Sequence, residues 1–239
     1  MPTKKQRIIG WIRAMRLHFL FAYVVLGLGG IFIGLAQFKI LNSIPYALLS
    51  FAIIIIMCIG INYRDEAADW IDGYDAEIGG TGVIREGILE ARPLQVSGRL
   101  LNTIAGGLAI IQIYFEPQLI YLAIPVAIMI IGSNYLTEKV TLGHELMPAF
   151  SFAATFLWVY LAQGWRLTQG TLLFFIFSFI IIFALVPYQD VGDYEADKKT
   201  GKKTLTVKLG IDKVGLFSIF IALVSLLFLY FAIYALLNP

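Results

Sequence analysis

Residues 170–189 have the sequence GTLLFFIFSFIIIFALVPYQ, which contains no charged side chain. The hydrocarbon core of a membrane is about 30 Å thick, and a helix of about 20 apolar residues crosses it. The run FIIIFALV inside this stretch does not alternate between polar and apolar residues, as a strand of a membrane barrel would. The stretch therefore predicts a transmembrane helix.

The rest of the chain repeats this pattern. Six further apolar windows of similar length lie at 17–36, 44–64, 98–115, 118–137, 146–164 and 214–237. Hydrophobic residues make up 59% of the chain and the mean hydropathy is +0.81, whereas a soluble domain is about 45–50% apolar. The sequence predicts an all-α fold: one domain, 1–239, built as a multi-pass transmembrane bundle of about seven helices.

The charged residues gather on one side of this predicted bundle. With the N-terminus inside, every Lys and Arg of the 18 except Lys39 and Arg166 falls on the inner side, and so does every Asp and Glu of the 16 except Glu116. The excess of basic residues predicts a cytoplasmic N-terminus in the cell membrane. Transporters usually keep ionisable groups near the midplane, and these helices have none there. The pattern favours an enzyme over a multi-pass transporter, and a net charge of +2 indicates no nucleic-acid partner.

Two acidic runs follow the second and the sixth windows. The first is N62-Y-R-D-E-A-A-D-W-I-D72 and the second is Q189-D-V-G-D-Y-E-A-D197. In each run three Asp residues share one face if the chain is helical. Mg²⁺ prefers oxygen ligands and binds through carboxylates together with substrate phosphates, so we expect Mg²⁺, or Mn²⁺ in its place; the alternative is that these are solvated loop acids. The expected metal ligands are Asp65, Asp69, Asp72, Asp190, Asp193 and Asp197.

The second run and its sequel, K-K-T-G201-K-K-T-L-T-V-K-L-G210, resemble the second signature of the UbiA superfamily of intramembrane prenyltransferases. The first run is similar to the family's N-x-x-N-D-x-x-D, with Asp65 and Ala68 in place of the two Asn residues. The loop G79-G-T-G-V-I-R-E-G87 resembles that of menaquinone-pathway members. The segment Y135-L-T-E-K139 fits the family's Tyr-x-x-x-Lys. The second run is also similar to that of archaeal lipid-forming members.

The resemblance implies a reaction and roles for particular residues. A prenyl diphosphate would ionise to an allylic cation, and the cation would alkylate an acceptor, in a central cavity open to the cytoplasmic side. His144 and Glu145 are candidates for deprotonating the acceptor. The catalytic residues implied are Asp69, Asp72, Asp190, Asp193 and Lys139. The implied substrate-binding residues are Asn62, Tyr63, Arg85, Tyr135, Lys198 and Lys202.

Several alternatives stay open at this stage. The partners expected are a prenyl diphosphate donor, membrane lipid, and an acceptor that is either a small aromatic quinone precursor or a lipid. A UbiA-like terpene cyclase or diphosphate hydrolase would use the same metal site without an acceptor. Members of the family usually have nine transmembrane helices, so seven windows indicate either a naturally shorter member or a truncated chain, with the difference falling after the second acidic run.

Overall fold

The computed structural model describes residues 2–38, 44–71, 73, 80–140 and 142–238, and for 130–139 and 200 it describes the backbone alone. Every regular element within these ranges is a helix. The long helices are α2 (Leu17–Phe38), α3 (Ile44–Ile71), α4 (Ala91–Phe115), α5 (Ile120–Lys139), α6 (Gly143–Leu161), α7 (Gln169–Gln189) and α10 (Ile211–Leu237). The short helices are α1 (Lys4–Ala14), η2 (Pro117–Leu119), η3 (Asp190–Asp193), α8 (Tyr194–Thr200) and α9 (Leu205–Leu209).

The seven long helices coincide with the seven apolar windows. Within the described ranges, five spans are long and apolar enough to cross a membrane: α2, α3, α4, α10 and the stretch from α7 to Lys199. The other two windows form α5 and α6. The prediction of an all-α multi-pass bundle is confirmed. Two bounds differ most from the windows, because α3 continues to Ile71 and α4 begins at Ala91.

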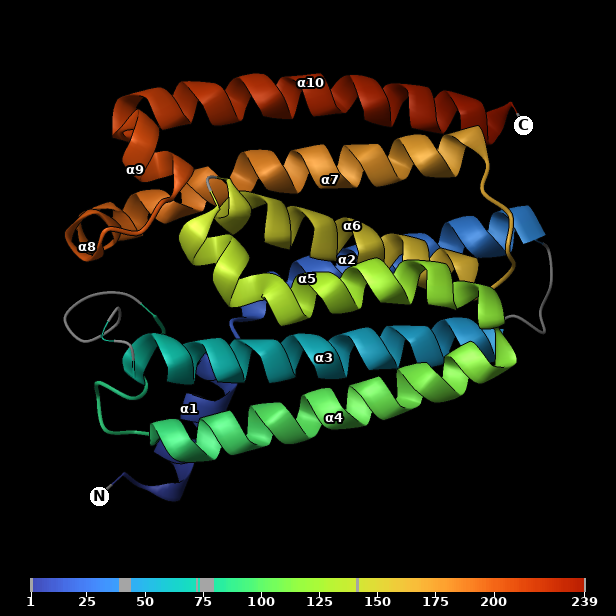
Figure 1. The fold of residues 1–239 in the computed structure, drawn as a ribbon. Coiled ribbons are helices and arrows are strands. Elements are labelled where there is room, and N and C mark those ends of the chain that lie inside the picture. Colours follow the sequence, from blue (N-terminus) through green and yellow to red (C-terminus); the bar gives the residue numbers. More distant parts are fainter. Residues whose placement is uncertain (1, 39–43, 72, 74–79, 141, 239) are drawn as a thin grey trace.

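The long helices lie side by side, as Figure 1 shows. Helix α6 lies in the interior of the bundle and contacts α2, α3, α5 and α7. Helix α10 packs along α7 at one edge, and α3 packs along α4 at the other. Helix α1 runs across the ends of these helices rather than along them, at the same end as α8 and α9 (Figure 1). Both acidic runs therefore belong to this end of the bundle.

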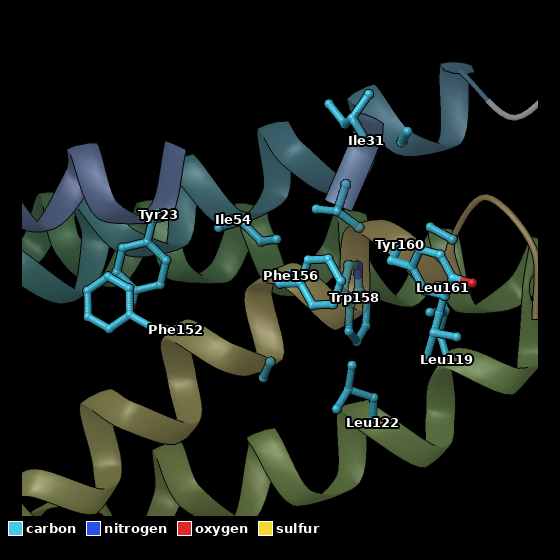
Figure 2. Close-up of a cluster of buried hydrophobic side chains, with 14 of the residues drawn as sticks. Tyr23, Ile31, Ile54, Leu119, Leu122, Phe152, Phe156, Trp158, Tyr160 and Leu161 are labelled. Carbon is cyan, nitrogen blue, oxygen red and sulfur yellow. The ribbon is translucent and has the colours of Figure 1, made fainter. Parts of the chain in front are cut away.

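The apolar core is built around the second half of α6. Phe156 and Tyr160 are fully buried, and Trp158 is nearly so. Figure 2 shows these rings packed among side chains from the neighbouring helices, with Tyr23 of α2 stacked on Phe152 at a centroid distance of 4.1 Å. Burying large aromatic side chains is a major source of core stability. This packing fixes the position of α6 within the bundle.

Two close helix contacts depend on glycine. A Cβ added to Gly30 of α2 would lie 2.8 Å from the carbonyl oxygen of Phe156 on α6. A Cβ added to Gly98 of α4 would lie 2.6 Å from the carbonyl oxygen of Gly60 on α3. Small residues let helix backbones approach closely, which is how packing is gained between membrane helices. The α2–α6 and α3–α4 pairs are therefore closely packed.

The end of the bundle opposite the acidic runs holds a neutral polar network. The amide nitrogen of Gln112, which is fully buried, donates to the carbonyl oxygen of Tyr46 at 3.0 Å and to Ser50 Oγ at 2.6 Å. Its amide oxygen accepts from Trp158 Nε1 at 3.1 Å. This network satisfies buried polar groups and joins α3, α4 and α6 without any charged group.

Candidate functional site

The first acidic run occupies the last turns of α3, and Arg16 reaches it from the junction between α1 and α2. Arg16 has a φ of 49°, a conformation that non-glycine residues rarely adopt. Its Nη2 atom lies 3.4 Å from Glu66 Oε2 and 3.4 Å from Asp69 Oδ2. Because α3 continues to Ile71, Asp65 and Asp69 stand one turn apart on the same helix, as the spacing predicts.

Glu66 lies beside these two acids and is buried, with a side chain only 3% exposed. The backbone N–H and the hydroxyl of Thr81, in the segment that leads to α4, both donate to the Glu66 carboxylate. The Thr81 hydroxyl lies 2.6 Å from Glu66 Oε1, and the Thr81 N–H lies 3.2 and 3.1 Å from the two carboxylate oxygens. The carboxylate therefore fastens the segment 80–89 to the end of α3.

Arg13 of α1 binds the same segment from the other side. Its guanidinium donates to the carbonyl oxygen of Thr81 at 2.6 Å and to both carboxylate oxygens of Glu86 at 2.7 and 2.8 Å. This bidentate pairing lowers the pKa of Glu86, and the nearby charge of Arg85 adds to that effect. Arg85 itself is exposed. The segment is thus held between α1 and α3, and Arg85 lies beside the Arg13–Glu86 pair.

The second acidic run begins where α7 ends. Asp190 follows directly, in the turn η3, and His144 Nε2 on the first turn of α6 lies 3.3 Å from each of its carboxylate oxygens. Asp193 is exposed, whereas Asp197 on α8 is buried. The chain passes from α7 through η3 to α8, so Asp190, Asp193 and Asp197 do not lie on one continuous helix and do not share one helical face. Asp190 and Asp197 still turn inward.

The segment after the second run is bound to α6 and α7 through polar contacts. The N–H of Leu205 donates to Glu145 Oε1 on α6, a carboxylate that is fully buried. Thr206 Oγ1 donates to the carbonyl oxygen of Pro187 at 2.5 Å, near the end of α7. The hydroxyl of Thr204 caps α9 by accepting from the N–H of Val207. These contacts fix the loop 201–204, which carries Lys202.

Lys202 connects the two acidic runs. Its Nζ atom lies 3.5 Å from Asp197 Oδ1. Burial lowers the pKa of Lys202, but the charges of Asp197, Asp69 and Asp190 outweigh burial and leave the pKa raised. Since Asp69 belongs to the first run and the other two belong to the second, both runs act on one ammonium group. The charges of Lys202, Arg16 and Asp69 also act on Asp65.

A hollow opens beside the loop 201–204 that carries Lys202. It has a volume of about 330 Å³ and is lined by Gly201, Lys202, Lys203, Thr204, Val207 and Lys208. Three of these residues are lysines.

Other residues predicted for the site have different surroundings. The amide of Asn62 donates to the carbonyl oxygen of Met15 at 2.6 Å, and Tyr63 OH donates to the carbonyl oxygen of Trp11 at 3.2 Å, so both hold the α1–α2 region against α3. Lys198 is exposed and lies 5.5 Å from the ring centre of Tyr194. Asp72 lies outside the described residues, as do the side chains of Tyr135 and Lys139.

The chemistry of the donors in this region suits Mg²⁺. Within the described part of the chain, no three His, Cys, Asp or Glu side chains converge as a ready-made metal cage. Mg²⁺ does not require one, because it usually binds through one or two carboxylates and completes its shell with water and substrate phosphates. Asp190 Oδ2 is buried and lies 3.3 Å from His144 Nε2, and as a carboxylate oxygen it is the kind of hard ligand that Mg²⁺ prefers. The residues therefore fit the ion.

The sequence model of the UbiA prenyltransferase family matches residues 87–239. This match covers more than half of the chain, so the chain belongs to the UbiA prenyltransferase family, whose members are intramembrane prenyl-transferring enzymes. The expected family membership is confirmed. The matched range includes the second acidic run and begins after the first. No curated protein and no solved structure matches the chain.

Sequence reasoning missed Arg16 and Glu66 as parts of this region. Glu66 follows Asp65 directly and precedes Asp69 by three residues, so its helical position was available as a signal. Arg16 carried no such signal. A basic residue just before an apolar window is already expected from the positive-inside rule, so nothing in the sequence marked it as part of the site.

Proposed function

We propose that the protein is a Mg²⁺-dependent intramembrane prenyltransferase that moves a prenyl group from a prenyl diphosphate to a small aromatic or lipid acceptor. The observation that carries the proposal is that both acidic runs lie at the same end of the bundle, each beside a cation: Lys202 Nζ lies 3.5 Å from Asp197 Oδ1, and Arg16 Nη2 lies 3.4 Å from Asp69 Oδ2. The charges of Asp69 and Asp190 also help to raise the pKa of Lys202. A diphosphate held by metal ions needs carboxylates for the metal and a cation for the phosphate oxygens in one space. The charges around Lys202 supply both.

The carboxylates of the two runs would hold the metal. We assign Asp69 and Asp190 as the principal ligands, with Asp65 and Asp197 supporting them and with Asp72 and Asp193 completing the sets that the sequence predicts. Bound there, Mg²⁺ would supply the charge that stabilises the departing diphosphate. The buried Oδ2 of Asp190, a hard oxygen ligand, supports its role. Arg16 keeps Asp69 oriented through its contact at 3.4 Å.

Lys202 would bind the oxygens of the diphosphate, and Lys139 would do so from the end of α5. The C–O bond of the allylic diphosphate breaks with both electrons leaving on the diphosphate, and the acceptor then supplies an electron pair to the allylic carbon and loses a proton. No protein nucleophile is needed, so the side chains act by charge stabilisation and positioning. His144, whose Nε2 atom contacts Asp190, is a candidate to receive the acceptor's proton.

The orientation in the membrane follows from the distribution of basic residues. All Lys and Arg residues except Lys39 and Arg166 fall on the side that carries the acidic runs. We therefore place this end of the bundle, and the N-terminus with it, on the cytoplasmic side of the cell membrane. The polar diphosphate headgroup of the donor would enter the site from the cytoplasmic side, and its apolar tail would lie among the helices.

The test is direct product analysis. Purified protein in lipid nanodiscs is incubated with radiolabelled prenyl diphosphates of several lengths, Mg²⁺, and a panel of dihydroxynaphthoate-type and glycerol-phosphate lipid acceptors. We expect a labelled product that forms only when an acceptor is present. A cyclic hydrocarbon, an alcohol or free diphosphate formed at the same rate without acceptor would instead identify a terpene cyclase or a hydrolase, and would overturn the transferase assignment.

A further inference from the structure

One face of helix α1 packs against the rest of the protein. Gly10 and Ala14 are its buried residues. A Cβ added to Gly10 would lie 2.6 Å from a side-chain carbon of Ile88, so this face packs directly on the segment before α4. The ring of Trp11 packs edge-on against Tyr63 of α3 at 5.0 Å. The position of α1 on the end of the bundle is therefore well defined.

The opposite face of α1 is apolar and exposed. At 3.6 residues per turn, Ile8, Ile9 and Ile12 project from the side opposite Gly10 and Ala14. Their exposed fractions are 52%, 44% and 43%. Leaving three isoleucines partly exposed to water forgoes the free energy of burying them. The described residues leave this isoleucine ridge, Ile8, Ile9 and Ile12, partly uncovered, so it requires a further apolar environment.

Basic residues accompany the ridge. Lys4, Lys5 and Arg7 are all exposed, and Lys4 and Lys5 lie along the ridge itself on the helical wheel. A helix that exposes isoleucines together with several basic residues suits the plane of a membrane surface, because long Lys side chains can extend past an apolar ridge to the headgroups. The charge of this surface suits anionic lipid headgroups, which attract basic residues placed beside a membrane.

The connection to α2 fixes the depth of α1. Only Met15 and Arg16 separate α1 from α2, which is a candidate membrane span beginning at Leu17. Because α1 runs across the bundle (Figure 1), its whole length of about 16 Å stays near the level at which α2 enters the membrane. A helix held at this level, with an apolar ridge facing away from the protein, meets the boundary between headgroups and acyl chains.

We infer that α1 is an interfacial lipid-binding helix, with the isoleucine ridge in the acyl boundary and with Lys4, Lys5 and Arg7 on anionic headgroups. Each basic residue beside an anionic surface strengthens such binding roughly fivefold. The other end of α1 is bound to α3 and to the segment 80–89 through Tyr63 and Arg13. The lipid layer therefore supports the part of the fold that carries the first acidic run, whatever reaction the site performs.

The test measures the depth of the ridge in the intact protein. A fluorophore is attached to Ile12→Cys, or in a second protein to Ile8→Cys, and the full chain is placed in nanodiscs of phosphatidylcholine with or without phosphatidylglycerol. The native Cys58 is buried and so does not compete for the label. Quenching by neutral acrylamide is compared with that of a label on Glu90→Cys, which is exposed at the same end of the bundle. We expect severalfold weaker quenching at both ridge positions.

Phosphatidylglycerol should weaken quenching at the ridge further, and the triple variant Lys4→Gln/Lys5→Gln/Arg7→Gln should lose this dependence. A matched triple, Arg92→Gln/Arg99→Gln/Lys213→Gln, removes the same charge elsewhere and should keep the dependence. Equal quenching at the ridge and at Glu90→Cys would show that the ridge faces water and would overturn the inference. An equal loss of the phosphatidylglycerol effect in both triple variants would overturn the assignment of Lys4, Lys5 and Arg7 as the headgroup-binding residues.

Discussion

Replacing Lys202 with glutamine tests two expected roles of this residue: pairing with Asp197, which affects stability, and binding the diphosphate, which affects the rate. The expected sizes of the two effects differ. The Nζ atom of Lys202 lies 3.5 Å from Asp197 Oδ1, with side-chain exposures of 26% for Lys202 and 8% for Asp197. Removing one partner of a buried ion pair costs about 3–5 kcal/mol, whereas an exposed pair contributes about 0–1 kcal/mol. Because Lys202 is partly exposed, we expect Lys202→Gln to lower the free energy of unfolding by about 1–3 kcal/mol.

The effect on catalysis should be larger. Removing one donor that stabilises a developing negative charge typically costs about 10²–10³ in kcat. If Lys202 binds the departing diphosphate, the loss should appear mainly in kcat, because the charge on the bridging oxygen increases as the C–O bond breaks. The control is Lys213→Gln at the start of α10, an exposed lysine of the same type, which should retain both stability and rate.

The assay combines single-turnover kinetics with denaturant unfolding of the detergent-solubilised protein. The double variant Lys202→Gln/Asp197→Asn also removes the carboxylate that has lost the ammonium group of Lys202, so it should recover much of the lost stability while the rate stays low. Recovery of the rate together with stability would show that Lys202 only neutralises Asp197. That result, or a Lys202→Gln variant as fast as the wild type, would refute the reasoning.

Three further predictions follow from the same geometry. Activity should disappear in excess EDTA and return with Mg²⁺ or Mn²⁺, as measured by product formation; full turnover in EDTA would contradict a metal-held diphosphate. Asp69→Asn and Asp190→Asn should each remove nearly all activity while Glu90→Gln stays close to wild type, and similar rates for all three would show that the ligands are misassigned. Thr81→Val should lower the free energy of unfolding by about 1.5–3 kcal/mol, because it deletes a hydroxyl donor to a buried carboxylate. The control Thr103→Val, whose exposed hydroxyl bonds only within its own helix, should change stability little, and equal losses would argue against the bond to the carboxylate.

The fold could be predicted from the sequence because apolar length alone determines where a helix crosses a membrane. The windows 44–64 and 98–115 each lie within an observed helix. The windows could not show that α3 continues to Ile71 and that α4 begins at Ala91, since polar helical turns outside the apolar region carry no hydropathy signal. Helix α1 was missed for the same reason: its apolar ridge is short and follows the basic residues Lys4, Lys5 and Arg7.

The candidate site was predictable only where residues of one type recur at helical spacing. The spacing of Asp65 and Asp69 indicated a shared helix, and α3 provides it. The spacing of Asp190 and Asp193 suggested the same, but Pro187, near the end of α7, cannot donate a backbone hydrogen bond, and the chain tightens into η3 directly after Gln189. Contacts between segments far apart in the sequence, such as Arg16 with Glu66, have no periodic signature.

Helix α6 explains why a site made of distant segments can keep its geometry. Its second half carries the buried rings of Phe156 and Tyr160, so the helix cannot slide or rotate without opening cavities in the core. Its first turn carries His144 and Glu145, which contact Asp190 and the N–H of Leu205. The packing in the membrane interior therefore sets the positions of the polar groups at the end of the bundle. A substitution in the core of α6 should consequently disturb the site without touching any of its charged residues.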